Sequence, residues 1–181
     1  MIGNGVIPAA TRAWVERHLR EGESIAGASR LRGGWTSEMR RLTIAGPYGS
    51  RQLVLRSLVK PFYVKHAHGL LSREAGVLRL LAGTEVPAAD LVAADPAGEH
   101  CEHPSLLMTS LPGRLRLDDP ASAEALAHML VRIHRVPVDD HTRPRAYQAW
   151  TSPDTVRVPA DTVRPDLWRR ASDLIRREPP A

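Results

Sequence analysis

Two charged residues in the first half of the chain are placed to form an ion pair inside a protein core. Arg56 follows the apolar run at 53–55, which predicts a largely buried strand. Glu74 starts an apolar helical stripe that continues at positions 77, 78 and 81. Because an isolated charge is costly to desolvate, we expect Arg56 and Glu74 to pair. A purely structural ion pair satisfies this argument as well as an anion-binding cation does.

A glycine-rich turn lies upstream of this pair. Gly33 and Gly34 lack a Cβ, so backbone amides there can approach a ligand closely, and Thr36 and Ser37 add hydroxyl donors. Such a turn is more often only a turn. The order along the chain supports the functional interpretation: a glycine turn, a strand ending in a cation, a helix with an inward carboxylate and then an apolar strand. Kinases arrange a phosphate-covering loop, a cation held by a helix carboxylate and a hinge in this order.

The elements that must position these residues follow from periodicity and turn signals. Strands are predicted over 39–44 and 53–56, joined by the turn 46–50, and again over 91–94 and 105–109. Ser72 is a candidate cap for a helix over 73–81. Further helices are predicted over 11–19, from Asp119-Pro120 to about 136, and over 166–177.

Five stretches in this order resemble the N-terminal lobe of the aminoglycoside phosphotransferase family. They are 33–38, 53–56, 73–81, 86–89 and 106–113, while 127–136 resembles the first helix of that family's C-terminal lobe. The resemblance covers about 25–180. It implies an α+β, protein-kinase-like N-lobe of antiparallel sheet plus helix, followed by a truncated helical C-lobe. The expected divisions are an N-lobe at 1–110, a hinge at 111–118 and a partial C-lobe at 119–181.

The resemblance also implies roles for individual residues. The glycine-turn residues Gly33, Gly34, Thr36 and Ser37 would cover the phosphates of ATP. Arg56 would contact the α- and β-phosphates, and Glu74 would orient it; an arginine can fork onto two phosphate oxygens. Met108 would pack beside the purine, although a plain core methionine fits equally well. The main chain from Thr109 to Leu111 would form the hinge that meets adenine.

The chain departs from the family pattern at the catalytic segment. None of its eight histidines is followed two residues later by Asp, so no H-x-D-x-x-x-x-N motif is present. Phosphoryl transfer needs metal ions and a carboxylate that positions the acceptor, and the expected magnesium ligands are missing. We therefore expect the ATP-binding part of a small-molecule phosphotransferase, truncated and inactive alone. Its acceptor would be an aminoglycoside, a choline-like amine or a sugar. The alternative is a non-catalytic nucleotide- or partner-binding module.

Composition limits the other classes of protein. The net charge is +5 over 181 residues, and positions 1–90 hold 13 Lys and Arg against 7 Asp and Glu, but no basic cluster indicates nucleic-acid binding. The longest stretch without charged residues has eleven residues, too short to cross a membrane. The single cysteine, Cys101, is consistent with a reducing cytoplasm.

Two further features remain outside the resemblance. The run from His100 to His103 has a spacing that matches no common zinc site, so a polar loop is expected there. The apolar stripes of the helices at 121–135 and 166–177 predict self-association, or cover by a missing C-terminal half.

Overall fold

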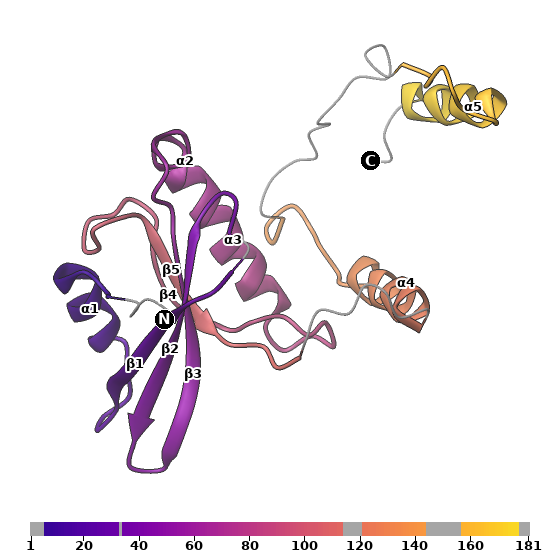
Figure 1. Cartoon of the computed structure of the whole chain (residues 1–181). Helices are drawn as coiled ribbons and strands as arrows, with labels where there is room; N and C mark the ends of the chain where they lie inside the picture. Colours follow the sequence, from indigo (N-terminus) through magenta and orange to yellow (C-terminus); the bar gives the residue numbers. More distant parts are fainter. Residues whose placement is uncertain (1–5, 33, 114–120, 144–156, 178–181) are drawn as a thin grey trace. The chain divides into compact units, whose positions relative to one another are not determined.

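The computed structural model describes residues 6–32, 34–113, 121–143 and 157–177. Its centre is a five-stranded antiparallel sheet with the strand order β1-β2-β3-β5-β4 (Figure 1). The strands are β1 (Ser24–Arg30), β2 (Glu38–Gly46), β3 (Gly49–Ser57), β4 (Leu91–Asp95) and β5 (Ser105–Thr109). This sheet, with the helix that packs on it, confirms the predicted kinase-like N-lobe architecture. Strand β3, which carries Arg56, is the central strand.

Four of the five strands were predicted, and β1 was not. The strand β1 has the sequence SIAGASR, which contains only one large apolar residue and therefore no alternating signal. Pairing with β2 makes it a strand: Ile25 lies opposite Ile44, and Ala28 lies opposite Leu42. Long-range pairing thus overrides the weak local propensity.

Alternation along β3 separates two cores. Leu53 and Leu55 face the helix α1 (Ala9–Glu16), where they pack with the buried Trp14. Val54 faces the other way, toward the helix α3 (Ala67–Leu81) and its buried Leu71. Figure 1 shows α1 and α3 on opposite sides of the sheet. Arg56 has the same parity as Val54, so it lies on the α3 face.

The prediction that Ser72 caps a helix starting at Arg73 was wrong. The helix α3 begins at Ala67, directly after the short helix α2 (Pro61–Lys65), and Ser72 lies inside it. The buried stripe of this helix begins before the predicted one: Ala67, Leu71 and Ala75 recur every fourth residue and are all buried. Helix α1 likewise starts two residues earlier than predicted, after Pro8, and ends at Glu16.

Two more helices follow the sheet. They are α4 (Ala121–His134) and α5 (Pro165–Arg176), which confirms helices at these places. The proposed start signal of α4, Asp119-Pro120, lies outside the described residues. The chain divides into two compact units, 1–144 and 145–181, and α5 belongs to the second. Within the part of the chain that is described, no helix is long and apolar enough to span a membrane.

Candidate functional site

Arg56 and Glu74 form the predicted ion pair. On the central strand, Arg56 lies between Met39 of β2 and Leu106 of β5, and its Nη1 donates to Oε2 of Glu74 on α3. The side chains are 26% and 28% exposed, so the pair is neither sealed in the core nor free in solvent. A cation held in this way is fixed in direction but still accessible to an anion.

The guanidinium of Arg56 has hydrogen-bonding capacity left over. Glu74 accepts from one of its terminal nitrogens, whereas Nε is buried and donates to no acceptor in the described part of the chain. The exposed part of the side chain, 26% of it, therefore belongs to other atoms of the guanidinium and its stem. Terminal nitrogens of an arginine held in this way could bind an anion such as a phosphate group.

The glycine loop starts beside this cation. A hydrogen bond of 2.8 Å from the amide of Leu31 to the carbonyl of Met39 closes the loop 32–38, and Met39 is the β2 residue opposite Arg56. A Cβ on Gly34 would lie 2.0 Å from the carbonyl oxygen of Ser37, so the loop folds back too tightly for any side chain there. Thr36 is half-buried and Ser37 is buried. Gly33 lies outside the described residues.

A lysine that the sequence did not single out contacts the loop. Nζ of Lys60 donates to the carbonyl oxygen of Trp35. Lys60 immediately precedes α2, so this contact ties the glycine loop to the connection between β3 and α2. No local sequence pattern indicates this contact, because Lys60 and Trp35 are 25 positions apart and meet only when the sheet has formed.

The predicted hinge begins at Thr109, the last residue of β5. The amide of Thr109 donates to the carbonyl of Asp90 at 2.9 Å, and its hydroxyl accepts from the Asp90 amide at 2.8 Å. The amide of Ser110 donates to the carbonyl of Gln52 at 3.3 Å. Leu111 is exposed, and no hydrogen bond to its main chain occurs among the described residues. Of the three hinge amides, that of Leu111 is therefore the one available to a ligand.

Apolar side chains share the α3 face with Arg56. Met108 is buried in the core cluster on that face, as expected for a core methionine. Its position beside Arg56's face of the sheet is also compatible with contact to a ligand. Leu31, Met39 and Leu91 pack against the same cluster and are partly exposed. They form an apolar surface next to the cation, a combination suited to a flat heterocycle linked to phosphates. Met39 and Leu31 carry no local sequence signal for this position, because it follows from strand pairing.

The run from His100 to His103 belongs to a loop organised by Asp95. The buried Asp95 carboxylate accepts from the amides of Glu99, His100 and Cys101 at 2.8 to 3.0 Å. Burial would raise the pKa of Asp95, but these amide donors outweigh it and lower that pKa. No group of three or more His, Cys, Asp and Glu is placed to hold a metal within the described ranges.

Comparison with known proteins adds three findings. Residues 27–181 match the family model of the phosphotransferase enzyme family. Among solved structures, a candidate aminoglycoside phosphotransferase from Ralstonia eutropha JMP134 is 21% identical, with a TM-score of 0.49. That match covers 94% of this chain and 48% of the other, so the chain spans about half the length of that protein. A comparison with curated proteins gave no match.

Proposed function

This chain belongs to the phosphotransferase enzyme family, and from that premise we propose that it is the ATP-binding part of a small-molecule phosphotransferase. The observation that carries the proposal is the Arg56–Glu74 ion pair on the α3 face, next to the glycine loop. The pair presents a fixed cation whose terminal nitrogens could bind an anion. ATP would supply the phosphoryl group that moves to an acceptor hydroxyl, and magnesium would offset the charge on its phosphates.

The residues of this chain hold and orient the nucleotide. Arg56 binds the α- and β-phosphates, and Glu74 keeps the guanidinium turned toward them. The loop around Gly34, with Thr36 and Ser37, covers the phosphates from the adjacent hairpin. Lys60 holds the loop through the Trp35 carbonyl. These contacts act on the position and charge of the triphosphate and are distinct from proton transfer at the acceptor.

The purine occupies the apolar surface formed by Leu31, Met39, Leu91 and Met108. Its polar edge meets the hinge. The Leu111 amide donates to a ring nitrogen, because the amides of Thr109 and Ser110 are already used by Asp90 and Gln52. Thr109 thus supports the hinge by fixing its course. This assigns the predicted adenine contact chiefly to Leu111.

The domain assignment goes with this proposal: an N-lobe at 1–110, a hinge at 111–118 and part of a helical C-lobe at 119–181. The H-x-D-x-x-x-x-N segment does not occur in these 181 residues. We therefore expect them to bind ATP without transferring phosphate on their own. The acceptor is a hydroxyl of an aminoglycoside, a choline-like amine or a sugar. The cytoplasm, which supplies ATP, is the proposed compartment.

Calorimetric titration with ATP, with and without magnesium, tests nucleotide binding. We expect saturable binding by the unsubstituted chain and a loss of at least about tenfold in affinity for Arg56→Met, since a charge-assisted contact is removed. The matched control is Arg17→Met, because Arg17 is exposed at the end of α1, a helix that packs on the opposite face of the sheet. Absence of saturable binding, or equal losses in both variants, would contradict the proposal.

A phosphate-release assay with candidate acceptors tests the second part. No turnover is expected from these residues alone. Turnover would refute the inactivity and leave the nucleotide site intact, whereas ATP binding without magnesium dependence would favour the non-catalytic module.

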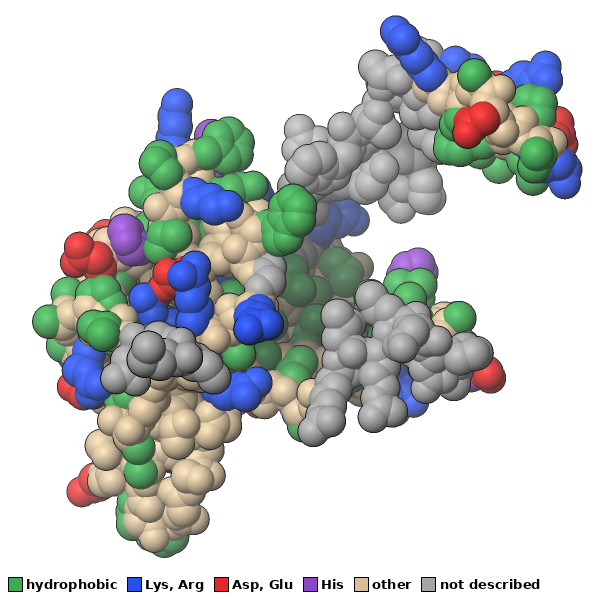
Figure 2. All heavy atoms as spheres, in the orientation of Figure 1, with side chains coloured by type: hydrophobic (Ala, Val, Ile, Leu, Met, Phe, Trp, Pro, Cys, Tyr) green, Lys and Arg blue, Asp and Glu red, His purple; other side chains and the backbone are tan. Residues whose placement is uncertain are grey.

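We also propose that the chain self-associates through α4 and α5. Large apolar side chains on both helices are exposed: Leu126, Leu130, Val131, Ile133, Leu167, Trp168 and Leu174. Figure 2 shows hydrophobic side chains on the surface of α5 among its basic ones. Exposed apolar surface of this kind favours association. Sedimentation should show oligomers that Leu130→Glu and Leu174→Glu weaken; a monodisperse monomer at all concentrations would contradict this.

A further inference from the structure

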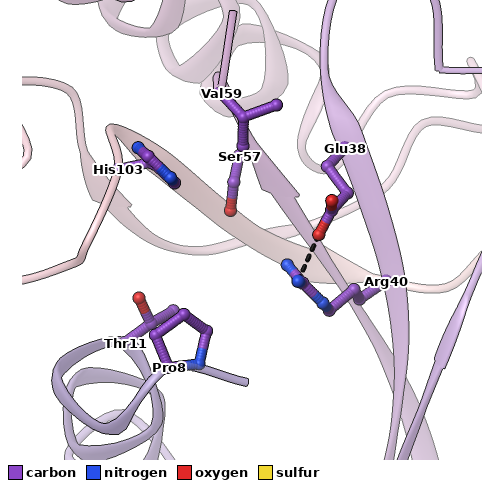
Figure 3. Close-up of a pocket in the computed structure, with 7 residues that line it drawn as sticks. All are labelled: Pro8, Thr11, Glu38, Arg40, Ser57, Val59 and His103. Carbon is purple, nitrogen blue, oxygen red and sulfur yellow. Dashed lines mark ion pairs between the residues drawn. The ribbon is translucent and has the colours of Figure 1, made fainter. Parts of the chain in front are cut away.

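A polar cavity lies on the face of the sheet opposite Arg56. It has a volume of about 200 Å³ and is lined by Pro8, Thr11, Glu38, Arg40, Ser57, Val59 and His103 (Figure 3). Met39 and Arg56 lie on the α3 face of the sheet. Arg40 follows Met39 and Ser57 follows Arg56, and successive strand side chains point to opposite faces, so Arg40 and Ser57 lie on the α1 face. The cavity is therefore separate from the proposed nucleotide site.

Arg40 supplies a cation with free donors. Its side chain is only 17% exposed, and Nη2 pairs with Oε1 of Glu38. No other ion pair or hydrogen bond of its guanidinium occurs within the described ranges, so most of its N–H groups are left for a ligand. In Figure 3 the guanidinium points into the space between Ser57 and Thr11. An arginine that is largely buried with one edge unused is suited to bind an oxyanion.

Two other elements bring donors to the same space. Thr11 is 3% exposed, and its hydroxyl accepts from the Glu102 amide at 3.0 Å and hydrogen-bonds the Cys101 thiol, so Thr11 shapes the wall of the cavity. The helix α1 begins after Pro8, where no side chain caps its first-turn amides. His103 adds an imidazole nitrogen from the segment before β5. Donors thus converge from α1, from β2 and from this segment.

The electrostatic surroundings of the cavity favour an anion. Glu38 and Arg40 balance each other within the lining, and Oε2 of Glu38 is also 3.8 Å from Nη2 of Arg30, which lies outside it. The second arginine offsets part of the carboxylate charge, and the positive end of α1 adds to the attraction for an anion. We propose that this cavity binds a small tetrahedral oxyanion: inorganic phosphate, or the phosphate group of a small phosphoester.

A tetrahedral anion fits better than a planar carboxylate because the donors come from three different directions. A phosphate group displaces roughly two waters, or about 60 Å³, which leaves part of the cavity for a small ester substituent against Pro8 and Val59. Ser57 does not compete as a donor. Its hydroxyl lies 2.8 Å from that of Ser105, which donates in turn to the His103 carbonyl, so the Ser57 proton is directed to Ser105.

The test is a titration with inorganic phosphate and, separately, with glycerol 3-phosphate. It is performed on the Arg56→Met chain, so that the nucleotide site does not contribute. Arg40→Met should lower the affinity at least about tenfold, because it removes the charged donor. Glu38→Gln should raise the affinity several-fold, because it removes the one negative charge and frees the guanidinium. If Arg40 and Glu38 only stabilised the fold, the two substitutions would not change the phosphate affinity in opposite directions.

Arg41→Met is the matched control, since Arg41 is exposed on the opposite face of β2. If Arg40→Met fails to fold, as judged by circular dichroism, Arg40→Lys keeps the positive charge and should still weaken binding, because it loses the forked donors of the guanidinium. Tighter binding of the phosphoester than of phosphate would identify the ester as the ligand, and the reverse would identify the free ion. Weak binding that is equal in all variants, or no binding, would overturn the proposal while leaving the nucleotide site unaffected.

Discussion

Nη1 of Arg56 and Oε2 of Glu74 join the central strand β3 to the helix α3 through a partly exposed ion pair. The partners are 18 residues apart, and each is supported by its own buried neighbours, Leu55 on the strand and Ala75 on the helix. The direction of the cation therefore depends on where α3 lies relative to the sheet. Any displacement of the helix would turn the guanidinium away from the proposed phosphate site.

Glu74→Gln tests whether the carboxylate orients the cation. ATP affinity should fall less than for Arg56→Met, about three- to tenfold, because a weaker partner remains for the guanidinium. Stability should change by no more than about 1 kcal/mol, since partly exposed pairs contribute little. Calorimetry with both single variants and the double variant measures the coupling between them. If their effects on ATP binding are additive, Glu74 does not act through Arg56.

Gly34→Ala tests the tight fold of the glycine loop. The new Cβ would lie 2.0 Å from the Ser37 carbonyl oxygen, so the loop must open, and ATP affinity should fall at least about tenfold. Gly69→Ala is the control: it lies in α3 with only the far end of Arg73 within 3.9 Å, and alanine should stabilise the helix by up to about 1 kcal/mol. Unchanged ATP binding by Gly34→Ala would remove the loop from the site.

Lys60→Met tests the tether between the loop and α2. Loss of the contact with the Trp35 carbonyl should increase the mobility of the loop and weaken ATP binding about threefold, and Lys60→Arg should restore most of it. The fluorescence of Trp35, identified by comparison with Trp35→Phe, reports the loop directly. Lys65→Met, at the exposed end of α2, should leave both signals unchanged. A Trp35 signal indifferent to Lys60→Met would show that the contact does not hold the loop.

The parts of this fold that the sequence predicted are those with a strong local signal. The apolar run before Arg56 and the stripe shared by Glu74 indicated both the elements and their pairing, because buried charges need partners. Strand β1 escaped notice because its small residues acquire strand structure only beside β2. The true start of α3 was missed because a serine resembled a cap. Lys60 and the cavity around Arg40 depend on contacts between distant segments, which no local pattern encodes.

The ion pair between Glu23 and Arg51 should make the folded protein less stable in acid. Two hydrogen bonds of 2.7 Å from the Arg51 guanidinium lower the pKa of Glu23 from 4.5 to about 2, against the opposing effect of burial. The folded pKa is below the unfolded one, so the pair stabilises the fold at neutral pH. That stability is lost as the pH falls from about 4.5 toward 2. Glu23→Gln should remove this part of the acid dependence in urea unfolding series, whereas Glu21→Gln, at an exposed neighbour, should not. Parallel pH curves for Glu23→Gln and the unsubstituted chain would contradict the assignment.

The thiol of Cys101 should be unreactive while the fold is intact. Burial raises its pKa to about 12, and the adjacent Asp95 carboxylate adds to the shift; the residue is only 6% exposed. At pH 8 the thiolate fraction is then lower than for an ordinary thiol by a factor on the order of a thousand, and the thiolate is the species that reacts. Labelling with a disulfide reagent should be very slow in native buffer and rapid in urea. Asp95→Asn should speed the native reaction, because it removes the negative charge and loosens the turn that three backbone amides close on this carboxylate. Rapid labelling of the unsubstituted native chain would show instead that the segment between β4 and β5 opens readily, so that Asp95 does not hold it closed.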